Sequence, residues 1–121
     1  MPCRVLIVDD HPGFRAQARA LLLAAGYQVA GEAADGKSAV RATVDLSPDV
    51  VLLDIQLPDI TGFEVARQLH SIPGPPAVVL ISSRAAADYG RRIGRSGAHG
   101  FISKADLSAP ALRALLEEAP G

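Results

Sequence analysis

At 121 residues, the chain has the size of one domain, and its 49% hydrophobic but only 4% aromatic residues point to a core built from Val, Leu, Ile and Ala. A formal net charge of -1 argues against a nucleic-acid-binding surface, and the single cysteine, Cys3, excludes an internal disulfide and a zinc cluster. The sequence contains neither an apolar run of about 20 residues nor the basic-then-apolar layout of a signal peptide. These features predict a soluble cytoplasmic domain without membrane contact.

Apolar runs and helical patterns alternate along the chain. Strands are expected at residues 3–8, 27–33, 49–53, 77–81 and 99–103. A helix is expected after each strand, at residues 12–25, 36–47, 62–70, 85–96 and from about 109 to 116. The second strand is the most polar and is expected at an edge, and Gly90 and Gly94 predict a fourth helix that is short or mobile. The alternation predicts an α/β fold with a five-stranded parallel sheet covered by helices on both faces.

Polar side chains stand directly after four of these strands. They are Asp9 and Asp10 after the first strand, Asp54 after the third, Ser82 after the fourth and Lys104 after the fifth. Because the carboxyl ends of parallel strands meet at one edge of a sheet, we expect these side chains to converge there. Each of them taken alone also fits an ordinary turn or surface position. Their shared place at the ends of strands favours a functional site.

The residue types at this edge indicate phosphate chemistry. Adjacent carboxylates repel one another unless a cation lies among them, and a few oxygen ligands suit magnesium better than calcium or zinc. Magnesium favours phosphoryl transfer, and a carboxylate can act as the nucleophile that forms an aspartyl phosphate. The chain uses Arg at ten of its twelve basic positions, so Lys104 indicates a site that needs a compact point charge. His11, beside the carboxylates, is interpreted as a turn residue.

These residues resemble the receiver domain of bacterial two-component response regulators over essentially the whole chain. The signature consists of the adjacent pair Asp9 and Asp10, the motif Asp54-x-x-Leu-Pro-x-x-x-Gly62, Ser82 and Lys104. The Asp-Asp-His-Pro stretch and residues 97–105 resemble the NarL/FixJ-type regulators. The resemblance implies a flavodoxin-like (βα)5 fold with strand order 2-1-3-4-5. Residues 1–116 would form the receiver domain, and residues 117–121 a C-terminal tail or the start of a linker.

The resemblance also implies roles for individual residues. Asp54 would receive a phosphoryl group from the phosphohistidine of a sensor histidine kinase. Mg²⁺ would be held by Asp9, Asp10, Asp54 and the backbone carbonyl of Gln56.

Two further roles concern the response to phosphorylation. Ser82 and Lys104 would bind the phosphoryl group, and Ser82 and Phe101 would form the conformational switch. Many receivers carry a cis proline after the lysine, whereas this chain has Ala105, so a trans bond is expected there.

The implied partners are a sensor histidine kinase or phosphotransfer protein and a second copy of the chain in a phosphorylation-dependent homodimer. DNA would be contacted only through a transcriptional output domain that is absent from this chain. The domain would catalyse only its own phosphorylation and dephosphorylation.

Three alternatives remain at this level: a stand-alone receiver, a pseudo-receiver that binds partners without phosphate, and a magnesium-dependent phosphohydrolase of the haloacid-dehalogenase type. Enzymes of that type carry an Asp-x-Asp motif after the first strand, whereas in this chain Asp9 and Asp10 are adjacent.

Overall fold

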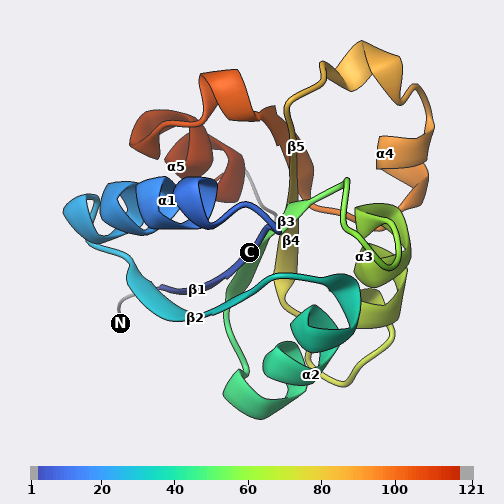
Figure 1. The fold of residues 1–121 in the computed structure, drawn as a ribbon, viewed down its shortest axis with the longest axis horizontal. Helices are drawn as coiled ribbons and strands as arrows, with labels where there is room; N and C mark the ends of the chain where they lie inside the picture. The colour runs from blue at the N-terminus through green and yellow to red at the C-terminus, as the bar shows by residue number, and fades with distance from the viewer. Residues whose placement is uncertain (1–2, 118–121) are drawn as a thin grey trace.

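The computed structural model describes residues 3–117 and contains one parallel five-stranded sheet. The strands are β1 (Arg4–Val8), β2 (Gln28–Ala33), β3 (Val50–Asp54), β4 (Ala77–Ser82) and β5 (Gly100–Ser103). The helices are α1 (Pro12–Ala24), α2 (Gly36–Leu46), α3 (Gly62–His70), α4 (Arg92–Arg95) and α5 (Ala109–Glu117). The strand order β2-β1-β3-β4-β5 confirms the predicted flavodoxin-like arrangement, with the polar strand β2 at an edge (Figure 1).

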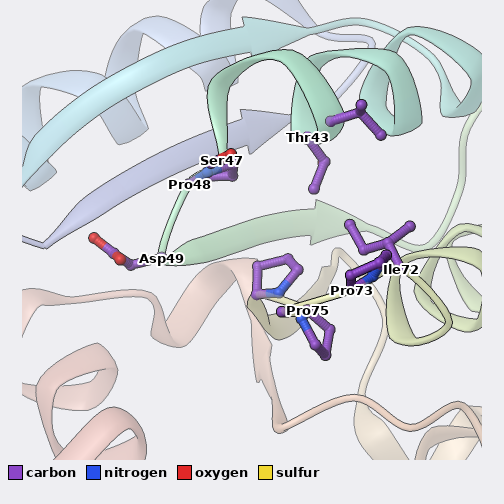
Figure 2. Close-up of a pocket in the computed structure, with 10 residues that line it drawn as sticks. Thr43, Ser47, Pro48, Asp49, Ile72, Pro73 and Pro75 are labelled. Carbon is purple, nitrogen blue, oxygen red and sulfur yellow. The ribbon is translucent and has the colours of Figure 1, made fainter.

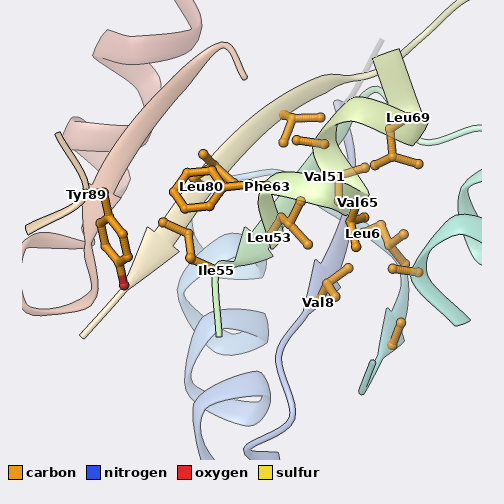
Figure 3. Close-up of a cluster of buried hydrophobic side chains, with 14 residues drawn as sticks. Leu6, Val8, Val51, Leu53, Ile55, Phe63, Val65, Leu69, Leu80 and Tyr89 are labelled. Carbon is orange, nitrogen blue, oxygen red and sulfur yellow. The ribbon is translucent and has the colours of Figure 1, made fainter. Parts of the chain in front are cut away.

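Side chains that alternate along the strands build two separate cores, one on each face of the sheet. Leu6, Leu53 and Leu80 pack with α2 and α3, as Figure 3 shows, whereas Ile7 and Leu52 pack with α1 and α5. All five side chains are fully buried, and burial of each contributes about 2 kcal/mol of stability. Because β1, β3 and β4 are apolar on both faces, they must lie inside the sheet, and their carboxyl ends meet at one edge.

The segment between β4 and β5 differs from the expected helix at residues 85–96. The structure has a 3-10 turn at Ala86–Asp88 and the four-residue helix α4. Gly90 lies between them with a φ of 57°, a left-handed conformation that interrupts an α-helix. The continuous helix was therefore a wrong prediction, whereas the short length expected from the two glycines is confirmed.

The last helix includes Glu117, one residue beyond the predicted domain boundary. The other residues of the predicted tail, 118–121, lie outside the described part of the chain. No helix within residues 3–117 is long and apolar enough to span a membrane.

Candidate functional site

Asp9, Asp54 and Lys104 meet at the carboxyl edge of the sheet. The carboxylates of Asp9 and Asp54 are 0% and 2% exposed, at the ends of the neighbouring strands β1 and β3. The Lys104 ammonium lies 2.6 Å from Asp9 Oδ2 and 3.5 Å from Asp54 Oδ2. It also lies 4.5 Å from the centre of the Phe14 ring, which holds the ammonium from the side of α1. A cation and two buried carboxylates from three different elements therefore share one place.

Asp10 and His11 complete the acidic side of this cluster. Asp10 is exposed, and His11 Nδ1 lies 3.0 Å from Asp9 Oδ1 and 3.1 Å from Asp10 Oδ1. The His11 backbone N–H also donates to Asp9 Oδ1 at 2.8 Å. Arg15 fixes the backbone from the other side, because its guanidinium donates to the Asp9 carbonyl at 2.7 Å. The turn after β1 is thus held by its own side chains.

Asp54 is positioned by the loop that connects β3 to α3. The Gln56 N–H donates to Asp54 Oδ1 at 3.2 Å, and the Gly62 N–H donates to the Ile55 carbonyl at 2.7 Å. A Cβ atom at Gly62 would collide with the backbone of Asp54 and Ile55. Glycine at this position lets the start of α3 approach the end of β3 closely.

The loop also contacts α2, because the Asp59 carboxylate accepts the N–H groups of Gly36 at 2.8 Å and Lys37 at 3.0 Å. These bonds satisfy N–H groups in the first turn of α2. The loop that carries Gln56 is therefore hydrogen-bonded both to the end of β3 and to the start of α2.

The environment of Asp54 raises its pKa. Burial is the main cause, the negative charge of Asp9 adds to it, and together they raise the pKa of Asp54 from 3.8 to about 6. The Lys104 ammonium and the Gln56 N–H act in the opposite direction. A pKa near 6 leaves the carboxylate mainly ionised at neutral pH, the form that a nucleophile requires.

The cluster fits a hard divalent cation. One ligand atom from each of Asp9, Asp10, His11 and Asp54 lies within 4.8 Å of the others. Asp9 Oδ2 is buried, and among residues 3–117 it accepts no hydrogen bond of good geometry, although the Lys104 ammonium is at ion-pair distance. A buried carboxylate oxygen that lacks a good hydrogen bond is stabilised when a metal ion binds to it. The cluster can therefore hold a metal.

Ser82 and Phe101 lie beside this edge and do not bond to Asp54. The Ser82 hydroxyl is buried, lies 2.6 Å from the Tyr89 phenol oxygen and accepts the Arg84 N–H at 3.1 Å. Phe101 is half-buried, with its ring centre 6.1 Å from that of Tyr89. The two predicted switch residues are thus linked through a tyrosine.

Sequence reasoning missed three residues of this region. His11 was assigned to a turn, although its position beside two carboxylates was a usable signal. Tyr89 lies in the stretch 85–96 that was expected to form one helix, and its contact with Ser82 depends on the turn at Gly90. Phe14 lies in the helix expected at residues 12–25, and nothing in the sequence places it over Lys104.

A cavity of about 430 Å³ lies at the opposite edge of the sheet (Figure 2). Its walls come from the end of α2, the loop at residues 47–49 that precedes β3 and the loop at residues 72–76. Its one carboxylate, Asp49, already accepts the Arg4 N–H at 2.9 Å. None of the predicted site residues lines this cavity, so it is not the site of the phosphate chemistry.

A parallel sheet of this strand order, with buried carboxylates, a lysine and a hydroxyl at its carboxyl edge, defines a flavodoxin-like domain with a candidate metal and phosphate site. The family model of the response regulator receiver domain matches residues 5–117. The chain therefore belongs to the response regulator receiver domain family. This family is not a classical enzyme family, and magnesium and phosphoaspartate are typical of it.

Individual proteins agree with this assignment. A putative transcriptional regulator of Pseudomonas aeruginosa is 39% identical over 101 residues, which cover 84% of this chain and 49% of that protein. The chain thus spans about half the length of the curated relatives it matches.

Two solved structures are also similar. The receiver domain of the putative response regulator NarL from Mycobacterium tuberculosis is 37% identical, with a TM-score of 0.85 and coverage of 99% of this chain and 98% of that one. This similarity confirms the predicted NarL/FixJ type. The complex of CheX and CheY with BeF3 and Mg²⁺ from Borrelia burgdorferi is 26% identical, with a TM-score of 0.84 and coverage of 96% and 87%.

Proposed function

We propose that Asp54 is the phosphoacceptor of this receiver domain. The observation that carries the proposal is the placement of its buried carboxylate beside a second buried carboxylate, Asp9, with the ammonium of Lys104 bridging the two. The Lys104 ammonium, together with a metal ion held by the carboxylates, would stabilise the negative phosphate oxygens that the reaction adds at the same place. The pKa of about 6 keeps Asp54 available as a nucleophile at neutral pH.

The transfer itself is a displacement at phosphorus. A carboxylate oxygen of Asp54 forms the new O–P bond, and the P–N bond to the kinase's phosphohistidine breaks. The electron pair of the broken bond stays on the imidazole nitrogen. The histidine leaves as neutral imidazole, because its ring either already carries a proton on the other nitrogen or takes one from solvent. The product is an acyl phosphate on Asp54.

Asp9, Asp10, Asp54 and the backbone carbonyl of Gln56 would hold Mg²⁺. When bound, this ion neutralises negative charge that develops on the transferring group. The buried Asp9 Oδ2 accepts no hydrogen bond of good geometry among residues 3–117, and the Lys104 ammonium would share this oxygen with the ion. The Gln56 peptide lies beside the cluster, because its N–H donates to Asp54 Oδ1. The bound BeF3 and Mg²⁺ named for the Borrelia burgdorferi complex support the same chemistry here.

Lys104 and Ser82 would bind the phosphoryl oxygens. Lys104 now spans Asp9 and Asp54, so its ammonium needs only a small shift to reach a group on Asp54. The Ser82 hydroxyl is hydrogen-bonded to the Tyr89 hydroxyl and the Arg84 N–H instead, so it must move to reach a phosphoryl group on Asp54. Phe101, half-buried beside Tyr89, would take up the space that this movement leaves.

The partners follow from the family and from the relatives. A receiver domain implies a kinase that supplies the phosphoryl group, directly or through a phosphotransfer protein. The similarity to a putative transcriptional regulator supports a transcriptional output, through which DNA would be contacted. Homodimer formation on phosphorylation remains part of this proposal.

The test is phosphorylation by a small donor. The protein is incubated with acetyl phosphate and magnesium, and intact mass spectrometry counts the phosphoryl groups. We expect one group per chain in the wild type and none in Asp54→Ala. Asp45→Ala is the matched control, because Asp45 is an exposed carboxylate on α2, and it should be labelled like the wild type. Equal labelling of Asp54→Ala would refute the assignment.

The same material separates the alternatives. A pseudo-receiver would bind no beryllofluoride in the presence of magnesium. A phosphohydrolase would turn over a simple phosphate ester many times, whereas a receiver should not.

A further inference from the structure

Ser82 and Tyr89 form a buried pair of hydroxyl groups. Their oxygen atoms lie 2.6 Å apart, and Ser82 is 0% exposed whereas Tyr89 is 8% exposed. Ser82 also accepts the Arg84 N–H at 3.1 Å. A serine hydroxyl offers one proton and two lone pairs, and so does a phenol. The pair therefore holds two protons, of which only one lies between the two oxygen atoms.

The difference in burial decides which hydroxyl donates. Among residues 3–117 the structure gives neither hydroxyl another acceptor, so the second proton must reach solvent or stay unbonded. An unbonded proton costs more at Ser82, which is 0% exposed, than at Tyr89, which is 8% exposed. The difference in burial therefore favours Ser82 as the donor to the phenol oxygen, an arrangement in which its only proton is already in use.

The ring of Tyr89 is held in place independently of its hydroxyl. It meets the Phe63 ring edge-on, at 5.5 Å between centres and 72° between planes, and it lies tilted against Phe101 at 6.1 Å. Figure 3 shows Tyr89 beside this aromatic part of the core. Because ring packing sets the position of the phenol oxygen, a phenylalanine at position 89 should occupy the same space.

We propose that Tyr89 is a positioning residue that restrains the switch by holding the Ser82 hydroxyl away from Asp54. The inference rests on the proposed function, because it concerns the proton that Ser82 would donate to a phosphoryl oxygen. Ser82 can donate that proton only after its bond to Tyr89 has broken. The unphosphorylated state is therefore favoured by one hydrogen bond that the phosphorylated state lacks.

The size of the effect follows from the net strength of one buried hydrogen bond. Removing the phenol hydroxyl removes the bond from the unphosphorylated state alone. Tyr89→Phe should therefore bind a phosphoryl mimic about two- to tenfold more tightly than the wild type.

The experiment is a calorimetric titration with beryllofluoride in the presence of magnesium. Four proteins form a double-mutant cycle: wild type, Tyr89→Phe, Ser82→Ala and the double variant. The gain in affinity from Tyr89→Phe should disappear in the Ser82→Ala background, because the two hydroxyls act as a pair. Tyr27→Phe removes the chain's other tyrosine, which is half-buried directly before β2, and should leave the affinity unchanged.

A spectroscopic measurement follows the bond itself. The chain has no Trp and only two Tyr, so in the Tyr27→Phe protein the near-ultraviolet tyrosine band comes from Tyr89 alone. Saturation with beryllofluoride should shift this band, since the phenol oxygen loses its donor. A band that stays in place while the ligand binds would overturn the inference.

The titrations distinguish three further results. An unchanged or weaker affinity of Tyr89→Phe overturns the restraint and leaves the proposed function standing. An equal gain in the Ser82→Ala background also overturns it, because the tyrosine would then act without Ser82. Failure of the wild type to bind beryllofluoride removes the proposed function and this inference with it.

Discussion

Replacement of Asp54 by asparagine should stabilise the metal-free protein at neutral pH. Asparagine has nearly the same shape and can still accept the Gln56 N–H, but it carries no charge. The folded-state pKa of about 6 lies well above the ordinary value of 3.8, because the carboxyl is buried and lies near Asp9. The folded protein therefore holds the Asp54 proton more tightly than the unfolded chain does.

The sign of the pH dependence follows from linkage. The stabilising effect of the raised pKa is present in full below the unfolded value of 3.8 and is lost as the pH rises through about 6. A shift of about two pKa units corresponds to about 3 kcal/mol, which solvent near the edge of the sheet reduces to about 1 to 2 kcal/mol. Asp54→Asn lacks this loss, so it should exceed the wild type by that amount at about pH 7.5.

Urea unfolding followed by circular dichroism measures the difference, with a chelator present throughout. The advantage of Asp54→Asn should shrink as the pH falls toward 4, because the wild-type carboxyl then binds its proton. Magnesium should raise the stability of the wild type and have a smaller effect on the variant. An Asp54→Asn protein that is less stable than the wild type in chelator at neutral pH would refute the reasoning about this carboxyl.

Two further substitutions test the geometry of the site. Gly62→Ala places a Cβ against the backbone of Asp54 and Ile55, so it should destabilise the protein by about 2 to 4 kcal/mol in urea unfolding and slow labelling by acetyl phosphate; a variant with wild-type values for both would contradict the close approach. Lys104→Met removes the cation beside the buried Asp9 carboxylate, so it should cost about 1 to 3 kcal/mol in chelator, and magnesium should restore most of it. No loss in chelator would show that the ion pair is unimportant.

The sheet and the site residues could be predicted because burial leaves a strong pattern. The run Val50–Leu53 is apolar on both faces and ends in a carboxylate, which fixes a central strand and the edge where its polar residue lies. The glycine at position 62 could be recognised as part of the motif, but the reason for it, the contact with the Asp54 backbone, required coordinates.

The segment after β4 could not be predicted in the same way. Its residues 85–96 have a helical spacing of apolar side chains, but the left-handed conformation of Gly90 divides it into a turn and a short helix. That division places the Tyr89 hydroxyl against Ser82. A contact between two segments depends on backbone conformation in both, and propensity describes only one segment at a time.

The most direct measurement locates the phosphoryl group on the chain. The protein is labelled with acetyl phosphate and magnesium, and borohydride then reduces the acyl phosphate to an alcohol, which leaves homoserine where the phosphorylated aspartate stood. Peptide mass spectrometry should find homoserine in place of Asp54 and at no other aspartate, and only when magnesium was present. Homoserine in place of Asp9 or Asp10, or labelling that is independent of magnesium, would contradict the account.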